Sequence, residues 1–305
     1  MAIKTNENIP VAALYSVTAC LMFAILGACV KSVSGELGNE QIVFLRNLFG
    51  FIFLLPFLFR FSGGVRNLAT KRPGLHALRT LAGLGSMYCF FYALGHILLS
   101  DAVLLSYTTP LFAPIIAHYW LRERLTRAIS LALVTGFVGV GFILKPEGSS
   151  FLLVAAWIAL LSGFFAAVAN TAIRKMSDTE PTIRVVFYYS LGCTIISFPA
   201  ASLAWQDITT GSWMTLMAAG ASATIGQLFL TQAYSHAPVA KIGPFVYFSV
   251  IFAAILGWIF WREWPDVLSL LGTALVITAG AIVLRSSRRQ KKPETVGTIS
   301  GYKER

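Results

Sequence analysis

Hydrophobic residues along the chain fall into long, nearly uninterrupted blocks that are separated by short polar segments. A helix that crosses the hydrocarbon core of a membrane needs about 20 mostly apolar residues. The two-residue alternation of membrane barrel strands is absent, so the pattern predicts an all-α integral membrane protein with ten transmembrane helices. The predicted spans are residues 11–30, 41–59, 74–94, 98–120, 128–144, 151–173, 185–204, 212–234, 239–261 and 266–284.

Composition excludes other classes of protein. Hydrophobic residues make up 56% of the 305 residues and charged residues only 12%, whereas soluble domains average about 45–50% and about 25%. A soluble globule could not bury so much apolar surface, and 23 Phe and 7 Trp are too many for a disordered chain.

The basic residues predict which way the spans run. The net charge is +11, and 19 of the 24 Lys and Arg lie in the segments on the side of the N-terminus. Positive charge accumulates on the cytoplasmic side of membrane proteins. We therefore expect a multi-pass protein of the cell inner membrane with both termini cytoplasmic, and no nucleic-acid partner.

Motifs for enzymatic or cofactor chemistry are missing from the sequence. There is no P-loop, no GxGxxG, no HExxH and no nucleophile elbow. The four cysteines lie inside apolar blocks without CxxC spacing, which favours reduced, unpaired thiols. We expect no enzymatic activity, no cofactor and no metal. No acidic residue lies near the centre of a span, so a carboxylate that couples transport to an ion is not identified.

The two halves of the chain resemble each other at an offset of about 140 residues. Arg122-Glu123 after the fourth span matches Arg262-Glu263 after the ninth, and Tyr107 matches Tyr247. Because each half has an odd number of spans, the second half enters the membrane in the opposite direction. The sequence thus predicts two inverted five-helix repeats, 1–148 and 149–285, followed by a basic cytoplasmic tail, 286–305. Inverted repeats are typical of alternating-access transporters.

One extended motif resembles a known family. It runs from Pro110 through Leu121-Arg122-Glu123-Arg124-Leu125-Thr126 into the glycine-rich helix 128–144, and its second copy begins at Trp261. Together with Phe44-Leu45-Arg46-Asn47, it resembles EamA-type transporters of the drug/metabolite transporter superfamily. The second copy departs from the motif at Pro265 and Asp266. The resemblance implies ten spans and transport of a small metabolite, without specifying which one.

Two arginines lie within predicted spans, where charges are costly and often functional. Arg46 and Arg79 are candidates to bind a carboxylate or phosphate through their planar guanidinium groups. The alternative is a structural arginine that reaches the interface or bonds backbone carbonyls. Arg46 has a further alternative, an ion pair with Asp101 or Glu40. We therefore expect Arg79 to be the better anchor.

Prolines and tyrosines in the fourth and ninth spans predict the wall of a cavity. Tyr107, Pro110 and Pro114 share one helical face, and Pro244 and Tyr247 occupy the ninth span. Proline frees backbone carbonyls, which a membrane tolerates only beside protein or a water-filled cavity. We expect the three prolines to break or gate the helices and both tyrosines to bind substrate. Kinks that merely improve packing stay open.

Other polar and aromatic residues complete the candidate site. Gln227 and Asn170 carry amides inside spans, and these bond either a neighbouring helix or a substrate. Tyr88 could stack on a ligand or pack in the core. Glycines in the spans, including Gly139 and Gly141, predict close helix packing.

These features together predict a secondary transporter. Its expected partners are the lipid bilayer and a small amphipathic metabolite, anionic or zwitterionic, moved by alternating access and exported rather than taken up. The alternative is a flippase for a lipid-linked or lipid-like substrate. Association into a homodimer stays open.

Overall fold

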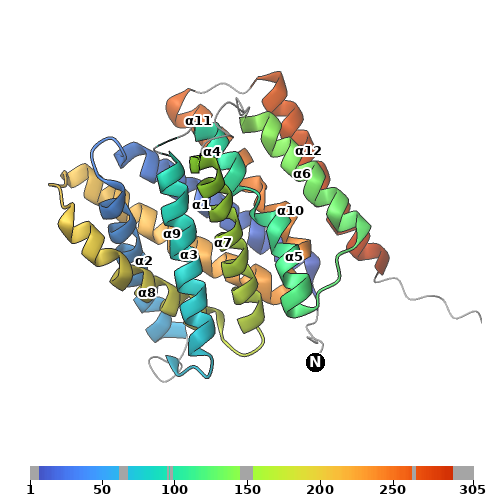
Figure 1. The fold of residues 1–305 in the computed structure, drawn as a ribbon, viewed down its shortest axis with the longest axis horizontal. Helices are drawn as coiled ribbons and strands as arrows, with labels where there is room; N and C mark the ends of the chain where they lie inside the picture. The colour runs from blue at the N-terminus through green and yellow to red at the C-terminus, as the bar shows by residue number, and fades with distance from the viewer. Residues whose placement is uncertain are drawn as a thin grey trace, which may run out of the picture.

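The protein is an all-helical bundle. The computed structural model describes residues 7–61, 68–94, 96, 99–144, 154–262 and 266–290, and within these ranges it contains no strand. The described residues form twelve helices (Figure 1). These are α1 (Ile9–Val33), α2 (Asn39–Phe61), α3 (Pro73–Leu94), α4 (Leu99–Ser106), α5 (Thr109–Leu121), α6 (Arg127–Leu144), α7 (Val154–Met176), α8 (Thr182–Leu203), α9 (Thr210–His236), α10 (Val239–Val246), α11 (Phe248–Trp261) and α12 (Val267–Gln290).

The predicted spans coincide with these helices, which confirms the all-helical class. The spans 98–120 and 239–261 each contain two helices, α4 with α5 and α10 with α11. In the described residues, eight helical stretches are long and apolar enough to cross a membrane, and one of them joins α10 to α11. The helices α3, α4 and α5 are not among these stretches, so the number of ten spans stays a prediction.

Both interrupted spans break next to a tyrosine. Tyr107 lies between α4 and α5, and Tyr247 lies between α10 and α11. Pro110 lies in the first turn of α5, just after the first break, and Pro244 lies just before the second. Pro114 lies inside α5, which continues through it. Because a proline has no backbone N–H donor, a carbonyl near each break lacks its usual partner within the helix.

The helices after the two breaks also end alike. Arg122 caps α5 and Arg262 caps α11, and both have a left-handed backbone with φ of 57°. Such a conformation is uncommon for a residue other than glycine, and it terminates a helix sharply. The matching sequence Arg-Glu at the two positions thus adopts the same backbone at both arginines.

Packing between helices brings distant parts of the chain together. The most extensive packing is between α1 and α9, between α6 and α12, and between α3 and α7. The helix α2 packs against both α8 and α9 (Figure 1). Glycines permit the closest crossings: a Cβ on Gly220 would lie 2.7 Å from the backbone nitrogen of Gly50, and one on Gly139 2.7 Å from the carbonyl oxygen of Gly272. Gly141 has open space instead, so it does not serve packing.

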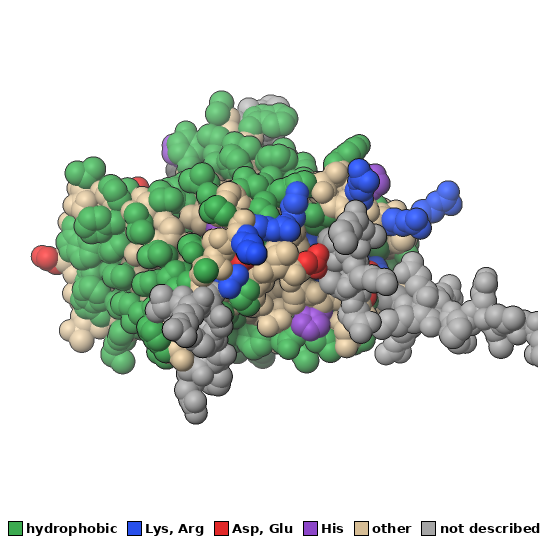
Figure 2. Space-filling view, turned by 90° about the horizontal axis from the view of Figure 1, so that it is seen from below, with side chains coloured by type: hydrophobic (Ala, Val, Ile, Leu, Met, Phe, Trp, Pro, Cys, Tyr) green, Lys and Arg blue, Asp and Glu red, His purple; other side chains and the backbone are tan. Residues whose placement is uncertain are grey.

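The bundle has two distinct ends. We call one of them the basal end. Four helices begin there, namely α1, α3, α8 and α10, and three helices end there, namely α5, α7 and α9. Asn8 N donates to His236 O there at 3.1 Å, and Lys241 pairs with Glu7. At the opposite end, Ser212 Oγ donates to Glu36 at 2.6 Å. The basal end lies at the bottom of Figure 1, and Figure 2 views it directly, with basic side chains gathered between hydrophobic flanks. The inverted repeat itself stays a prediction.

Candidate functional site

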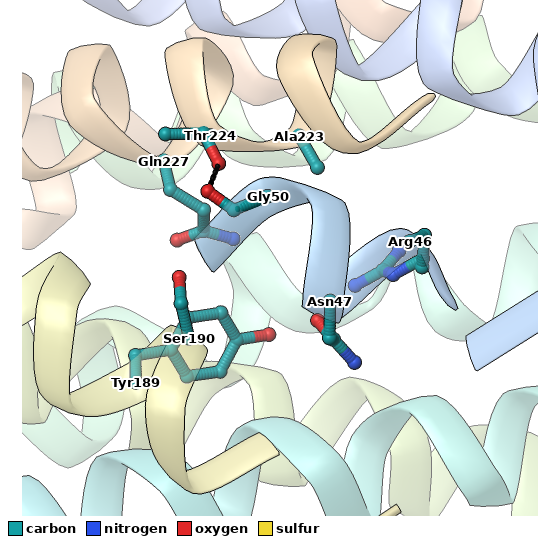
Figure 3. Close-up of a pocket in the computed structure, with 8 residues that line it drawn as sticks. All are labelled: Arg46, Asn47, Gly50, Tyr189, Ser190, Ala223, Thr224 and Gln227. Atoms are coloured by element: carbon teal, nitrogen blue, oxygen red, sulfur yellow. Dashed lines mark hydrogen bonds between the residues drawn. The ribbon is translucent and has the colours of Figure 1, made fainter. Parts of the chain in front are cut away.

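A polar pocket lies within the bundle where α2, α8 and α9 meet (Figure 3). Its free volume of about 10 Å³ is room for roughly one water molecule. Figure 3 shows the side chains of Gln227 and Ser190 facing each other across it. A metabolite can therefore enter only if these helices move apart. The pocket is lined by Arg46, Asn47, Gly50, Tyr189, Ser190, Ala223, Thr224 and Gln227.

The pocket wall is held together by the crossing of α2 and α9. Thr224 Oγ1 donates to the carbonyl oxygen of Gly50 at 2.7 Å, and Asn47 Nδ2 donates to Val43 O at 2.9 Å. A side chain at position 50 would meet Thr224 Oγ1 at 2.9 Å, so the absence of a Cβ at Gly50 allows this bond. Polar groups are thereby fixed in an otherwise apolar environment.

Arg79 of α3 lies directly behind this lining. Its side chain is buried, its Nη2 donates to Gln227 Oε1 at 2.9 Å, and its Cζ lies 3.8 Å from the centroid of the Tyr189 ring. A Cβ at Gly83, one turn along α3, would clash with Arg79 Nη1. Gly83 therefore leaves the space in which the guanidinium folds back against its own helix.

Arg46 lies in the pocket wall, and none of the described side chains forms an ion pair with it. Its Nε is buried and has no acceptor among the described residues. No described carboxylate pairs with it, and this includes Glu40. The side chain of Asp101 lies outside the described part of the chain, so that ion pair stays untested. Arg46 shares this pocket with Tyr189, whose ring Arg79 covers from behind.

The two tyrosines of the interrupted spans lie elsewhere. Tyr107 bonds Ser249 Oγ through its hydroxyl, which ties the first break to α11. Tyr247 is fully buried in an apolar cluster against Gly136 of α6. Its hydroxyl has no partner among the described residues. The structure therefore does not bring Tyr107 or Tyr247 to the polar pocket, and their substrate contacts remain predictions.

The prolines pack at the crossing of the two interrupted spans. A Cβ on Gly243, which precedes Pro244 in α10, would lie 3.4 Å from Pro110 Cβ. Pro110 and Pro114 are buried in this region, as is Pro244. The arrangement agrees with a packing role, and gating by these residues remains a prediction.

The remaining predicted residues are divided between the pocket and its surroundings. Gln227 lines the pocket. Tyr88 packs on the neighbouring cluster that contains Tyr189 and Cys193. Asn170 is half-buried on α7, and no hydrogen bond of its side chain is found in the described residues.

Sequence reasoning missed part of the lining. Tyr189, Ser190 and Asn47 were not among the candidates, although the predicted repeat aligns Tyr189 with Arg46. That alignment did not by itself mark Tyr189 as a site residue, because tyrosine and arginine differ in chemistry. In the described residues, no group of three or more His, Cys, Asp or Glu could hold a metal ion.

A buried ion pair lies at the basal end. Arg174 Nε donates to Glu123 Oε1 at 3.2 Å, and Glu123 Oε2 accepts from the backbone nitrogen of Val239 at 2.9 Å. Arg174 Nη1 also donates to Tyr234 O at 2.8 Å. We call Glu123 and Arg174 the basal clasp, because they join the ends of α5, α7 and α9 to the start of α10. Burial raises the pKa of Glu123, although Arg174 and Val239 N oppose that shift.

A second carboxylate cluster lies at the same end. Glu180 accepts hydrogen bonds from Arg184 at 2.6 Å and from Thr70 at 2.7 Å, and His76 Nε2 lies 3.6 Å away. Burial raises the pKa of Glu180, but Arg184, Thr70 and His76 outweigh it, so this pKa lies below its ordinary value of 4.5. The charged carboxylate thus fastens α3 to α8.

The chain is similar to characterised transporters along most of its length. It is 34% identical to the pseudopaline exporter of Pseudomonas aeruginosa, covering 90% of this chain and 96% of that protein. It is 27% identical to the S-adenosylmethionine uptake transporter of Rickettsia bellii (85% and 88% covered) and 26% identical to the riboflavin transporter of Vibrio cholerae (92% and 95% covered).

Fold comparison agrees with the sequence comparison. A solved crystal structure superposes with a TM-score of 0.80 at 20% identity, covering 92% of this chain and 99% of the other. The model of the EamA-like transporter family matches twice, at residues 10–145 and 153–285. The chain therefore belongs to the EamA-like transporter family of the drug/metabolite transporter superfamily, and it is a multi-pass membrane transporter rather than an enzyme.

Proposed function

We propose that the protein is a secondary transporter that exports a small amphipathic, anionic or zwitterionic metabolite across the cell inner membrane. The observation that carries this proposal is the buried guanidinium of Arg79 behind a pocket that already contains Arg46. Cations inside a membrane are costly unless they are compensated, so the pocket favours an anionic group. Export is favoured over uptake by the similarity to the pseudopaline exporter.

Alternating access between two inverted halves is supported by matched local structure. Cys20 Sγ of α1 lies 3.4 Å from Phe245 O at the second break. Gly163 of α7 occupies the equivalent position, and its Cβ would lie 3.1 Å from Ser106 O at the first break. Each half thus packs its first helix against the interrupted span of the other half, as repeats of opposite direction would.

The direction of the helices supports the same arrangement. At the basal end, α1 and α3 begin, whereas their counterparts α7 and α9 end there. We assign the repeats to residues 1–148 and 149–285, with the basal end and both termini cytoplasmic. The basal clasp then closes the cytoplasmic entrance, and its opening would admit substrate from the cytoplasm.

A flippase for a lipid-like substrate is the second candidate function. An apolar groove of about 340 Å³ lies between α3 and α8, with Pro73, His76 and Tyr188 in its wall. It could hold an acyl chain at the flank of the bundle. The polar pocket is not part of this groove, and for that reason we favour a small metabolite.

Metabolite profiling tests the proposed function. Cells that overproduce the protein should accumulate one or a few acidic metabolites in the medium, compared with cells that overproduce the Arg79→Gln variant at equal membrane abundance. We expect at least about a tenfold loss of export, because one charge-assisted bond is worth about 1.5–3 kcal/mol. An unchanged medium, or export of a neutral lipid instead, would overturn the proposal.

A further inference from the structure

The pocket region contains two guanidinium groups for which the described side chains provide no counter-anion. Arg46 Nε and Arg79 Nε are both buried, and neither has an acceptor in the part of the chain that the structure describes. None of the described carboxylates forms an ion pair with either group. The Arg79 guanidinium lies over the Tyr189 ring, and Tyr189 lines the pocket together with Arg46. A ligand with one anionic group would neutralise one guanidinium and leave the other without a counter-charge.

The neutral amide of Gln227 lies beside Arg79, at the place where a counter-anion would bind. Its Oε1 accepts from Arg79 Nη2 at 2.9 Å, and the same side chain lines the pocket. A carboxylate that enters the pocket therefore meets the Gln227 amide before it reaches Arg79. Because a carboxylate can accept two parallel N–H bonds and carries charge, it is a stronger acceptor than the amide.

The rest of the lining provides no site for a cation. The other polar side chains there are neutral: Asn47, Tyr189, Ser190 and Thr224. An ammonium group would approach two arginines without any carboxylate among the lining residues. A ligand with two negative groups therefore fits the charges better than a simple zwitterion does.

We infer that the pocket binds a dianionic metabolite, with one anionic group held by Arg46 and the other by Arg79 after it displaces Gln227. This inference rests on the proposed transport function and narrows its substrate class. Carboxylate and phosphate groups share the chemistry that the two guanidinium groups recognise.

Thermal unfolding of the purified full-length protein tests the inference with matched probes. Adipate and glutarate carry two carboxylates, and their monomethyl esters carry one at similar size. Binding to the folded protein raises the unfolding temperature in proportion to affinity. Each diacid should bind about tenfold or more tightly than its monoester, the difference expected for one charge-assisted pair.

Two variants separate the roles of the arginines. In Arg46→Gln the diacid should lose its advantage and bind as the monoester does. In Gln227→Glu a carboxylate of the protein itself neutralises Arg79, so the diacid advantage should vanish while monoester binding persists. Gln227→Glu retains the size of the side chain, which guards against loss of folding. Arg124→Gln removes an exposed arginine outside the pocket and should retain the full advantage.

The outcomes distinguish this inference from the transport proposal. Equal stabilisation by diacid and monoester, no stabilisation by either, or a diacid advantage that survives both pocket variants overturns the dianion site. Export of an acidic metabolite in the profiling experiment could still stand in those cases. Loss of export with a persisting diacid advantage would instead retain the binding site and contradict transport.

Discussion

At the scale of single residues, the two tyrosines that the predicted repeat aligns have opposite hydroxyl environments. The Tyr107 hydroxyl bonds Ser249, whereas the Tyr247 hydroxyl is buried without a partner in the described residues. A buried polar group without a partner costs free energy, and a satisfied one contributes about 0.5–1.5 kcal/mol. Equivalence in sequence therefore does not imply equal roles.

Phenylalanine substitutions at these two positions should change the free energy of unfolding differently. Tyr107→Phe removes a hydrogen bond and should lower the free energy of unfolding by about 0.5–1.5 kcal/mol. Tyr247→Phe removes an unsatisfied hydroxyl and should leave stability unchanged or raised. Thermal unfolding of both variants in one detergent measures the difference. A larger loss for Tyr247→Phe would indicate a partner for that hydroxyl.

Residue patterns predict the site only in part, for a physical reason. Arg46, Arg79 and Gln227 stand out because charges and amides are rare inside spans, and the structure places them together. Tyr189 and Ser190 do not stand out, because tyrosine and serine occur in spans for many reasons. Their role depends on the direction in which α8 faces, which one sequence does not specify.

At the scale of elements, glycines determine how closely the helices cross. Gly220 of α9 approaches the backbone of Gly50 on α2, whereas Gly27 of α1 has open space around it. The spans themselves were predictable from hydrophobic length. The breaks at Tyr107 and Tyr247 were indicated by nearby prolines, but the helix boundaries within those spans depend on tertiary contacts.

Alanine substitutions at these glycines should separate the effect of close contact between helices from the effect of helix propensity. Gly220→Ala places a methyl group against the α2 backbone and should destabilise the protein by about 1–3 kcal/mol. Gly27→Ala meets no neighbour and should be neutral or stabilising by up to about 1 kcal/mol. The midpoint of thermal unfolding reports both. Equal effects would mean that α2 and α9 are not in close contact.

At the scale of the whole molecule, buried carboxylates fasten the basal end. The pKa of Glu123 is raised above its ordinary value because burial dominates there. The pKa of Glu180 is lowered because its hydrogen-bonding and charged partners dominate. A pKa that is lowered in the folded state contributes stability above the unfolded value, and this stability is lost as pH falls through the folded value.

The pH dependence of unfolding follows from the lowered pKa of Glu180. Wild type should be more stable than Glu180→Gln by its full margin at neutral pH. The margin should shrink as pH falls below the ordinary value of about 4.5, where unfolded chains begin to protonate this side chain. Thermal unfolding of both proteins, from about pH 7 down to the acid limit of folding, measures this margin. A margin that grows toward acid would contradict the role of the Arg184 and Thr70 bonds.

Access to the pocket from the two sides of the membrane tests the central claim most directly. Ala223 lines the pocket, so Ala223→Cys, in a protein whose four native cysteines are replaced by alanine, can report access by a membrane-impermeant thiol reagent. Alternating access predicts modification from either side. It also predicts that Glu123→Gln, which removes the charge from the basal clasp, increases modification from the cytoplasmic side and decreases it from the other. Modification from one side only, unaffected by Glu123→Gln, would contradict the account.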